Sequence, residues 1–158
     1  MNKSMLFTDG SVNTKTKVGY GAYLVVHDFK MLLELLKLKI KIKRFENTSS
    51  AKLELQILLH ALGEIKSSDD KVIVYTDSQN LISLPERREV FEKNDYRSKK
   101  GKLLNNSGLY KEFYKLTDRI NCEFIKVIGH KKSNQKDDIE NIFTLVDRAS
   151  RKALRNNL

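Results

Sequence analysis

Four acidic residues border apolar segments, and they constrain the fold because carboxylates are rarely buried without partners. Asp9 follows the strand-like run 5–8, and Asp77 ends a second strand-like run. Glu54 and Asp147 lie beside the apolar stripes of two expected helices. A fold that satisfies all four must bring two strand ends and two helices to one place. Divalent cations could compensate the repulsion there.

Apolar periodicity predicts one α/β domain over residues 1–158, a length that allows a sizeable core. Short connections early in the chain predict a meander of three antiparallel strands. The helix–strand alternation after it predicts a mixed sheet covered by helices. The first strand is expected to end in a turn at Asp9. Strands are expected at 3–9, 18–26, 36–45, 71–76 and 122–128, and helices at about 50–66, 109–119 and 138–155.

Residues 36–45 alternate between apolar side chains and lysines, which predicts a half-buried strand. A lysine row of this kind fits a solvated face or an edge protected from aggregation, and the alternative is a track for phosphates. The row consists of Lys37, Lys39, Lys41 and Lys43.

The chain has 30 Lys and Arg against 20 Asp and Glu, which gives a formal net charge of +10. A positive field favours polyanions such as nucleic acid, although solubility alone is an alternative explanation. No apolar run approaches the length of about 18 residues that a membrane span needs. The sequence also leads directly into its first strand, which leaves no room for a signal peptide. We therefore expect a cytoplasmic monomer with no membrane partner.

The four carboxylates together predict a metal site built from oxygen ligands. The sequence has no row of His or Cys that would suit zinc, whereas carboxylates suit Mg²⁺ or Mn²⁺. Two such ions about 3.5–4 Å apart can activate a water and stabilise the leaving oxygen in phosphodiester hydrolysis. Taken singly, each acid has an ordinary explanation as a turn former, a helix first-turn acid or a helical partner of Arg151.

Five features of the sequence resemble the ribonuclease H family, type 1. They are Thr8-Asp9-Gly10-Ser11, Glu54 in the first long helix, Tyr75-Thr76-Asp77-Ser78-Gln79, Gly129-His130 and Asp147. The resemblance implies a ribonuclease H-like α/β fold, with a five-stranded mixed sheet of order 3-2-1-4-5 flanked by helices. It also implies an endonuclease that hydrolyses the RNA strand of an RNA–DNA hybrid with two Mg²⁺ ions, or Mn²⁺, leaving 3′-hydroxyl and 5′-phosphate ends.

The resemblance assigns a role to each candidate catalytic residue. Asp9, Glu54 and Asp77 would hold the metals, with Asp9 bridging them. Asp147 would support the second metal. His130 resembles a mobile histidine that assists proton transfer or product release, although the gap between His130 and Asp147 is longer than the family usually has.

Further residues resemble the family's nucleic-acid contacts. Gln79 and the backbone near Gly10 and Ser11 resemble RNA-strand contacts, and Asn13 is the nearest candidate for a polar contact in the following loop. Ser49 resembles a hydroxyl residue that binds a DNA phosphate. The basic stretch 87–102 resembles a protrusion that grips the DNA strand, and the alternative is an ordinary solvated loop. Its candidate contacts are Lys99, Lys100 and Lys102.

Two other functions share some of these features. Another nuclease of the same superfold, such as a resolvase-like or transposase-like core, would share the fold. A catalytically silent nucleic-acid-binding module would share the positive charge. The Thr-Asp-Ser-Gln and Gly-His segments favour the hybrid nuclease. The four acids argue against a silent module, because binding alone gains nothing from buried negative charge.

Overall fold

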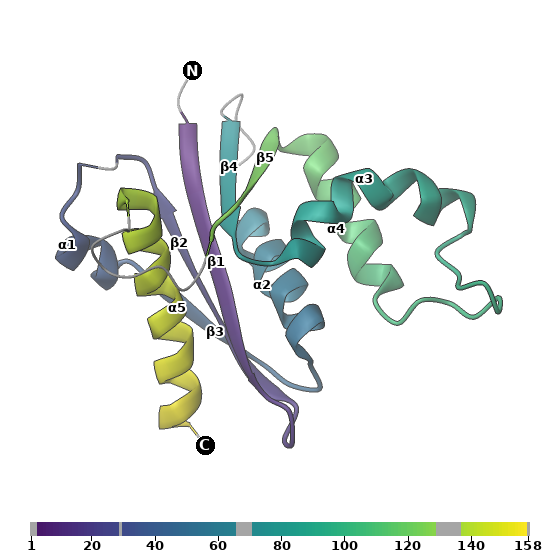
Figure 1. The fold of residues 1–158 in the computed structure, drawn as a ribbon, viewed down its shortest axis with the longest axis horizontal. Coiled ribbons are helices and arrows are strands. Elements are labelled where there is room, and N and C mark those ends of the chain that lie inside the picture. The colour runs from purple at the N-terminus through teal and green to yellow at the C-terminus, as the bar shows by residue number, and fades with distance from the viewer. Residues whose placement is uncertain (1–2, 29, 66–70, 129–136, 158) are drawn as a thin grey trace.

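The computed structural model describes residues 3–28, 30–65, 71–128 and 137–157 (Figure 1). Its strands are β1 (Lys3–Asn13), β2 (Val18–Val26), β3 (Lys41–Phe45), β4 (Lys71–Thr76) and β5 (Cys122–Lys126), and its helices are α1 (Leu33–Leu38), α2 (Ser50–Glu64), α3 (Gln79–Lys93), α4 (Ser107–Arg119) and α5 (Asp138–Asn156). Across these ranges, none of the helices combines the length and apolarity that crossing a lipid bilayer requires.

The five strands form one mixed sheet of order β3-β2-β1-β4-β5, which confirms the predicted order. β1 and β2 pair antiparallel, as do β2 and β3. β4 pairs parallel with both β1 and β5. β1 is therefore the central strand, and the two strands that carry Asp9 and precede Asp77 are direct neighbours.

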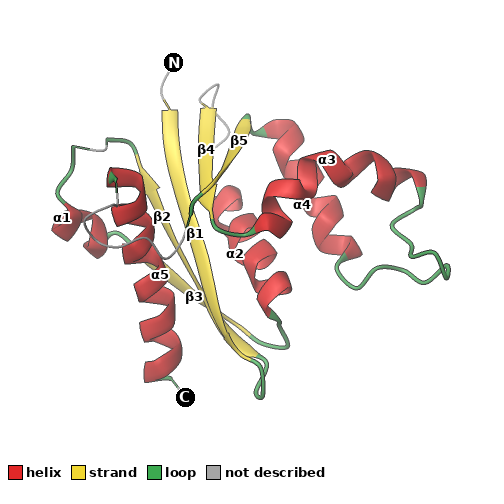
Figure 2. Ribbon diagram, viewed as in Figure 1, coloured by secondary structure: helices red, strands yellow, loops and turns green. Residues whose placement is uncertain are grey.

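Helices cover both faces of the sheet (Figure 2). α5 packs on one face together with the short α1, and α2 packs on the other face with α3 and α4 against it. Each face has its own core. Phe7 of β1 and Val146 of α5 are buried in the first, and Leu58 of α2 and Phe113 of α4 in the second. The central strands β1, β2 and β4 are thus covered on both faces, whereas the outer strands β3 and β5 carry exposed residues.

β1 continues beyond Asp9, so the predicted turn at this residue is wrong. The strand pairs with β2 as far as Asn13, which lies opposite Val18. The turn follows over 14–17, where the side-chain Oδ1 of Asn13 accepts hydrogen bonds from the backbone N–H groups of Lys15 (2.9 Å) and Thr16 (3.2 Å). An asparagine that bonds to the backbone ahead of it in this way is a typical turn former. The side chain of Asn13 is thereby engaged in the turn.

The predicted strand at 36–45 is also wrong in its first half. Residues 33–38 form α1, and only Lys41–Phe45 pairs with β2. Leu36 is 1% exposed in the core beneath α5, whereas Leu38 is 82% exposed, so the apolar residues do not share one strand face. Leu, Glu and Lys are strong helix formers, and this propensity prevails over the alternating pattern.

The sequence pattern did not reveal α3. Only Leu81, Leu84 and Phe91 of this helix are buried, which is a sparse apolar stripe, and Pro85 interrupts it. Proline in a helix interior removes a backbone donor, so this segment has a weak helical signal. The basic stretch 87–102 consequently divides between the end of α3 and the connection to α4.

Candidate active site

The parallel pairing of β1 with β4 brings Asp9 and Asp77 to one edge of the sheet. Phe7 lies opposite Tyr75, and each acid follows two residues later in its own segment. β4 ends at Thr76 while β1 continues, so the edge of β1 is uncovered beside Asp9. Because this edge is open, side chains from helices on both faces of the sheet can reach it.

Glycines in β1 and β2 allow α2 to approach this edge closely. A Cβ atom at Gly10 would lie 2.9 Å from Leu53 Cδ2, and one at Gly19 would lie 2.7 Å from the same atom. Both distances are shorter than carbon–carbon contact allows. Leu53 immediately precedes Glu54, so the absence of side chains on the two strands allows that carboxylate to reach the site.

Ser78 holds Glu54 in position from the other side of the site. Its hydroxyl donates to Glu54 Oε2 at 2.6 Å and accepts from the backbone N–H of Leu81 at 3.2 Å. Ser78 thereby also caps the N-terminus of α3. Burial raises the pKa of Glu54, the Ser78 hydrogen bond opposes that rise, and the negative charge of Asp77 adds to it. Sequence reasoning gave Ser78 no role, although a serine between a strand end and a helix is an N-cap signal.

α5 supplies Asp147 to the same site, and a serine pair holds the helix against β1. Ser11 Oγ and Ser150 Oγ are 3.0 Å apart, and Ser150 Oγ donates to the backbone oxygen of Asp147 at 2.9 Å. Arg151 Nε donates to Asp147 Oδ1 at 3.0 Å. The hydroxyl of Ser11 thus positions α5, while the guanidinium of Arg151 balances part of the charge of Asp147.

All four acids line one open hollow of about 370 Å³, together with Gly10, Ser11 and Arg151. The crowding of these carboxylates affects the pKa of Asp9 most strongly. Burial, a hydrogen bond with Asp147, and the charges of Asp77 and Asp147 raise the pKa of Asp9 to about 9, against a smaller opposing effect of the Gly10 backbone. Without a cation, this raised pKa favours the protonated form of Asp9 near neutral pH, hydrogen-bonded to Asp147.

The donor set fits hard divalent cations, because it consists of carboxylate oxygens alone. Among the described residues, no three Asp, Glu, His or Cys side chains already surround a common point as metal ligands. The four carboxylates line the hollow, but they do not yet surround one common metal position. The raised pKa of Asp9 reflects the repulsion that a bound cation would relieve.

Comparison with known proteins assigns the family. The family model described as RNase H matches residues 1–154. The chain belongs to the RNase H family. Among solved structures, it is similar to a foamy virus protease–reverse transcriptase in complex with double-stranded DNA, with a TM-score of 0.66 and 12% sequence identity, covering 96% of each chain. That similarity shows a shared fold. No curated protein matches the chain.

Several predicted contacts of this RNase H chain lie outside the lining of the hollow. Ser49 caps α2, and its hydroxyl accepts from the backbone N–H of Lys52 at 3.3 Å. Gln79 begins α3, and its Oε1 accepts from Lys126 Nζ at 3.0 Å. Asn13 serves the β1–β2 turn. Each of these side chains already has a partner within the fold.

The predicted lysine contacts of the RNase H chain lie in the connection between α3 and α4, on the side of the molecule away from α5 (Figure 1). Arg97 and Leu103 form an isolated antiparallel bridge at its base. The exposed lysines are Lys99, Lys100 and Lys102. His130, with Gly129, lies outside the described residues, so its predicted role stays a prediction.

Proposed function

We propose that this RNase H chain is an endonuclease that hydrolyses the RNA strand of RNA–DNA hybrids and leaves 3′-hydroxyl and 5′-phosphate ends. The observation that carries the proposal is the convergence of Asp9, Glu54, Asp77 and Asp147 on one open hollow in a chain of this family. The net charge of +10 adds an attraction for nucleic acid.

Asp9, Glu54, Asp77 and Asp147 would hold two Mg²⁺ or Mn²⁺ ions. When bound, such ions supply an activated water and stabilise the leaving oxygen. The chain's own residues prepare this site. Ser78 fixes Glu54 and opposes the rise of its pKa that burial causes, which favours the ionised ligand. The raised pKa of Asp9 favours its protonated form, so Asp9 would release its proton on serving as a metal ligand.

Selectivity for RNA requires contacts with 2′-hydroxyl groups, which distinguish it from DNA. Gly10 and Ser11 line the hollow, so their backbone is available to a strand that enters it. Gln79 lies two residues beyond Asp77, at the start of α3. We assign the RNA strand to this side, with Gln79 exchanging its bond to Lys126 for one to the substrate.

A panel of matched duplexes tests the proposal. RNA–DNA, RNA–RNA and DNA–DNA duplexes of one sequence, labelled on each strand, are incubated with the protein and either Mg²⁺ or a chelator. We expect Mg²⁺-dependent cleavage confined to the RNA strand of the hybrid. Cleavage of DNA–DNA duplexes would indicate a resolvase-like or transposase-like nuclease instead. Binding without cleavage would indicate a silent nucleic-acid-binding module.

A further inference from the structure

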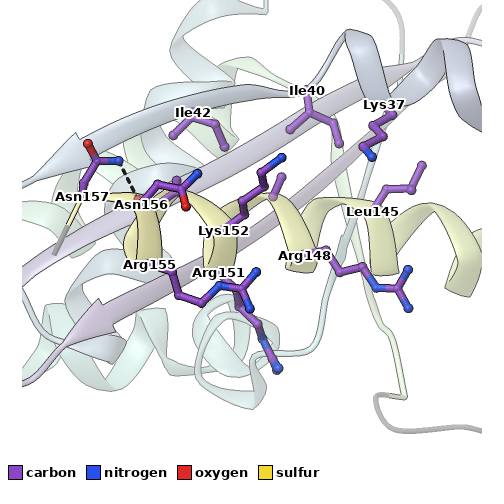
Figure 3. Close-up of a pocket in the computed structure, with 12 residues that line it drawn as sticks. Lys37, Ile40, Ile42, Leu145, Arg148, Arg151, Lys152, Arg155, Asn156 and Asn157 are labelled. Atoms are coloured by element: carbon purple, nitrogen blue, oxygen red, sulfur yellow. Dashed lines mark hydrogen bonds between the residues drawn. The ribbon is translucent and has the colours of Figure 1, made fainter.

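A second and larger hollow lies between the C-terminal half of α5 and the segment formed by α1 and β3 (Figure 3). Its volume is about 690 Å³. Ile40 and Ile42 line it on one side and Leu145 on the other. We call this hollow and the adjoining outer surface of α5 the α5 groove. Its cationic residues are Lys37, Arg148, Arg151, Lys152 and Arg155.

The cations of the α5 groove are arranged along the helix. Arg148, Lys152 and Arg155 are spaced by four and three residues, so their backbone positions follow one another along α5, although the side chain of Lys152 extends to one flank and the two arginines to the other. From the first to the last, the row covers about 10.5 Å at 1.5 Å per residue. In Figure 3, Lys37 and Lys152 point into the space between α5 and β3, and the three arginines lie along the other flank of α5. Positive charge therefore extends over the exposed side of the helix.

No acidic side chain lines the α5 groove in the described part of the protein. Arg151 is paired with Asp147, but its other four cations make no ion pair with any described carboxylate. All four α5 cations are exposed. Like charges gathered in this way repel one another, and a polyanion that displaces their counterions relieves the repulsion. The charge pattern thus identifies the occupant as anionic and extended.

Arg151 connects the two hollows, because it lines both the catalytic hollow and the α5 groove. Its neighbour one turn earlier, Asp147, is one of the four catalytic acids. A strand whose phosphate lies at the acids therefore needs to pass only this one side chain to reach the cationic row. At about 3.4 Å per nucleotide of one strand, the row matches about three phosphates.

We propose that the α5 groove binds the sugar–phosphate backbone of a single-stranded extension of the substrate strand that passes through the catalytic hollow. This proposal rests on the proposed function. The aliphatic lining, with Ile40, Ile42 and Leu145, offers apolar surface to unpaired bases, whose faces a duplex does not expose.

The test compares two charge-neutralised variants in chelator, where binding is measured without cleavage. Lys152→Gln/Arg155→Gln removes two charges from the groove. Lys115→Gln/Arg119→Gln removes two exposed, unpaired charges from α4 and serves as the matched control. The ligands are a blunt hybrid and the same hybrid with an RNA extension of about six nucleotides at either the 5′ or the 3′ end. Fluorescence anisotropy at several salt concentrations gives Kd, and circular dichroism checks that both variants fold.

We expect the wild type and the control variant to bind one of the two extended hybrids about tenfold more tightly than the blunt one. The groove variant should lose this preference. Its salt slope on the extended hybrid should fall by about 1.4, at about 0.7 for each single-strand phosphate contact. Equal binding of blunt and extended hybrids by the wild type, or equal effects of the two variants, would overturn the proposal. An acidic protein as the true occupant would give that result.

Cleavage by the wild type separates this proposal from the proposed function. If the blunt hybrid is not cleaved in Mg²⁺, the hybrid nuclease is wrong, whatever the extended hybrids do in chelator. If the blunt hybrid is cleaved but the groove variant binds extensions as the control does, the nuclease stands and the α5 groove proposal fails.

Discussion

The acidic hollow, lined by Asp9, Glu54, Asp77 and Asp147, and the α5 groove both include residues of α5 but carry opposite charges. In the hollow, Asp9, Glu54 and Asp147 are half-buried and Asp77 is exposed; Ser78 holds Glu54, Arg151 contacts Asp147, and the pKa of Asp9 rises to about 9. In the groove, the exposed cations other than Arg151 have no ion pair with a described carboxylate. Exposed charge costs little stability and needs little positioning, whereas buried charge costs more and is positioned closely. The exposed cations of the groove suit the collection of a polyanion, and the positioned carboxylates of the hollow suit chemistry.

Removing one acid from the hollow should have the largest effect. Asp9→Asn takes away the carboxylate that interacts with both Asp77 and Asp147. We expect hybrid cleavage in Mg²⁺ to fall on the order of 10³-fold, the scale on which losing one group that stabilises transition-state charge is felt. Glu89→Gln, which neutralises an exposed acid on α3, should leave single-turnover rates unchanged. Equal loss in both variants would remove the distinction between the hollow and the surface.

The stability of the metal-free protein should depend on pH through Asp9. Its pKa is 3.8 ordinarily and about 9 in the fold, so the folded state holds a proton that the unfolded state has lost. This contribution is complete below the ordinary value and is lost as pH rises towards the raised one, by at most about 1.4 kcal/mol per pH unit. Thermal unfolding in chelator from about pH 5 to 8 should show a steeper fall for the wild type than for Asp9→Asn. Parallel curves would mean that Asp9 is not crowded.

Two helix-capping serines distinguish positioning in the hollow from simple capping. Ser78→Ala and Ser49→Ala each remove an N-cap and should each lower the free energy of unfolding by about 1 kcal/mol. Only Ser78 also donates to Glu54, and losing that bond should raise the pKa of Glu54. The acidic limb of the cleavage pH profile should therefore move to higher pH in Ser78→Ala alone. A shift of the same size in Ser49→Ala would contradict this role.

The basic connection between α3 and α4 should give the smallest effect. Neutralising Lys99, Lys100 and Lys102 should weaken binding of a blunt hybrid and reduce the salt slope by about 0.9 for each phosphate contact on B-form duplex. The preference for an extended strand should remain, because that is assigned to the α5 groove. An unchanged slope would mean that these lysines form an ordinary solvated loop.

Local patterns in the sequence predicted most of the strands and helices, and the resemblance to the ribonuclease H family implied the sheet order. Apolar runs such as 71–76 and the helical stripe around Leu58 reflect burial directly. The predictions were wrong where tertiary packing decided the outcome. Leu36 of α1 packs beneath α5, which adds to the helix propensity of its segment, and pairing with β2 extends β1 past Asp9. A single sequence does not show such long-range choices.

The sequence also did not predict the α5 groove, because residues far apart in the chain form it. Lys37 was predicted to lie in a row of strand lysines, and instead it lies in α1 and lines a hollow with residues from the far end of the chain. The role of Ser78 in holding Glu54 likewise depends on how α2 and α3 meet. The sequence shows that Lys37 carries a charge and Ser78 a hydroxyl, but their neighbours become visible only in the fold.

Proton release on metal binding tests most directly whether the hollow is a cation site. Mn²⁺ is titrated into wild type and Asp9→Asn at neutral pH, by calorimetry in buffers of different ionisation enthalpy. Because the raised pKa of Asp9 favours its protonated form near neutral pH, we expect the wild type to release about one proton at saturation and Asp9→Asn to bind more weakly and release none. Binding by the wild type without proton release, or equal binding by both proteins, would contradict the account.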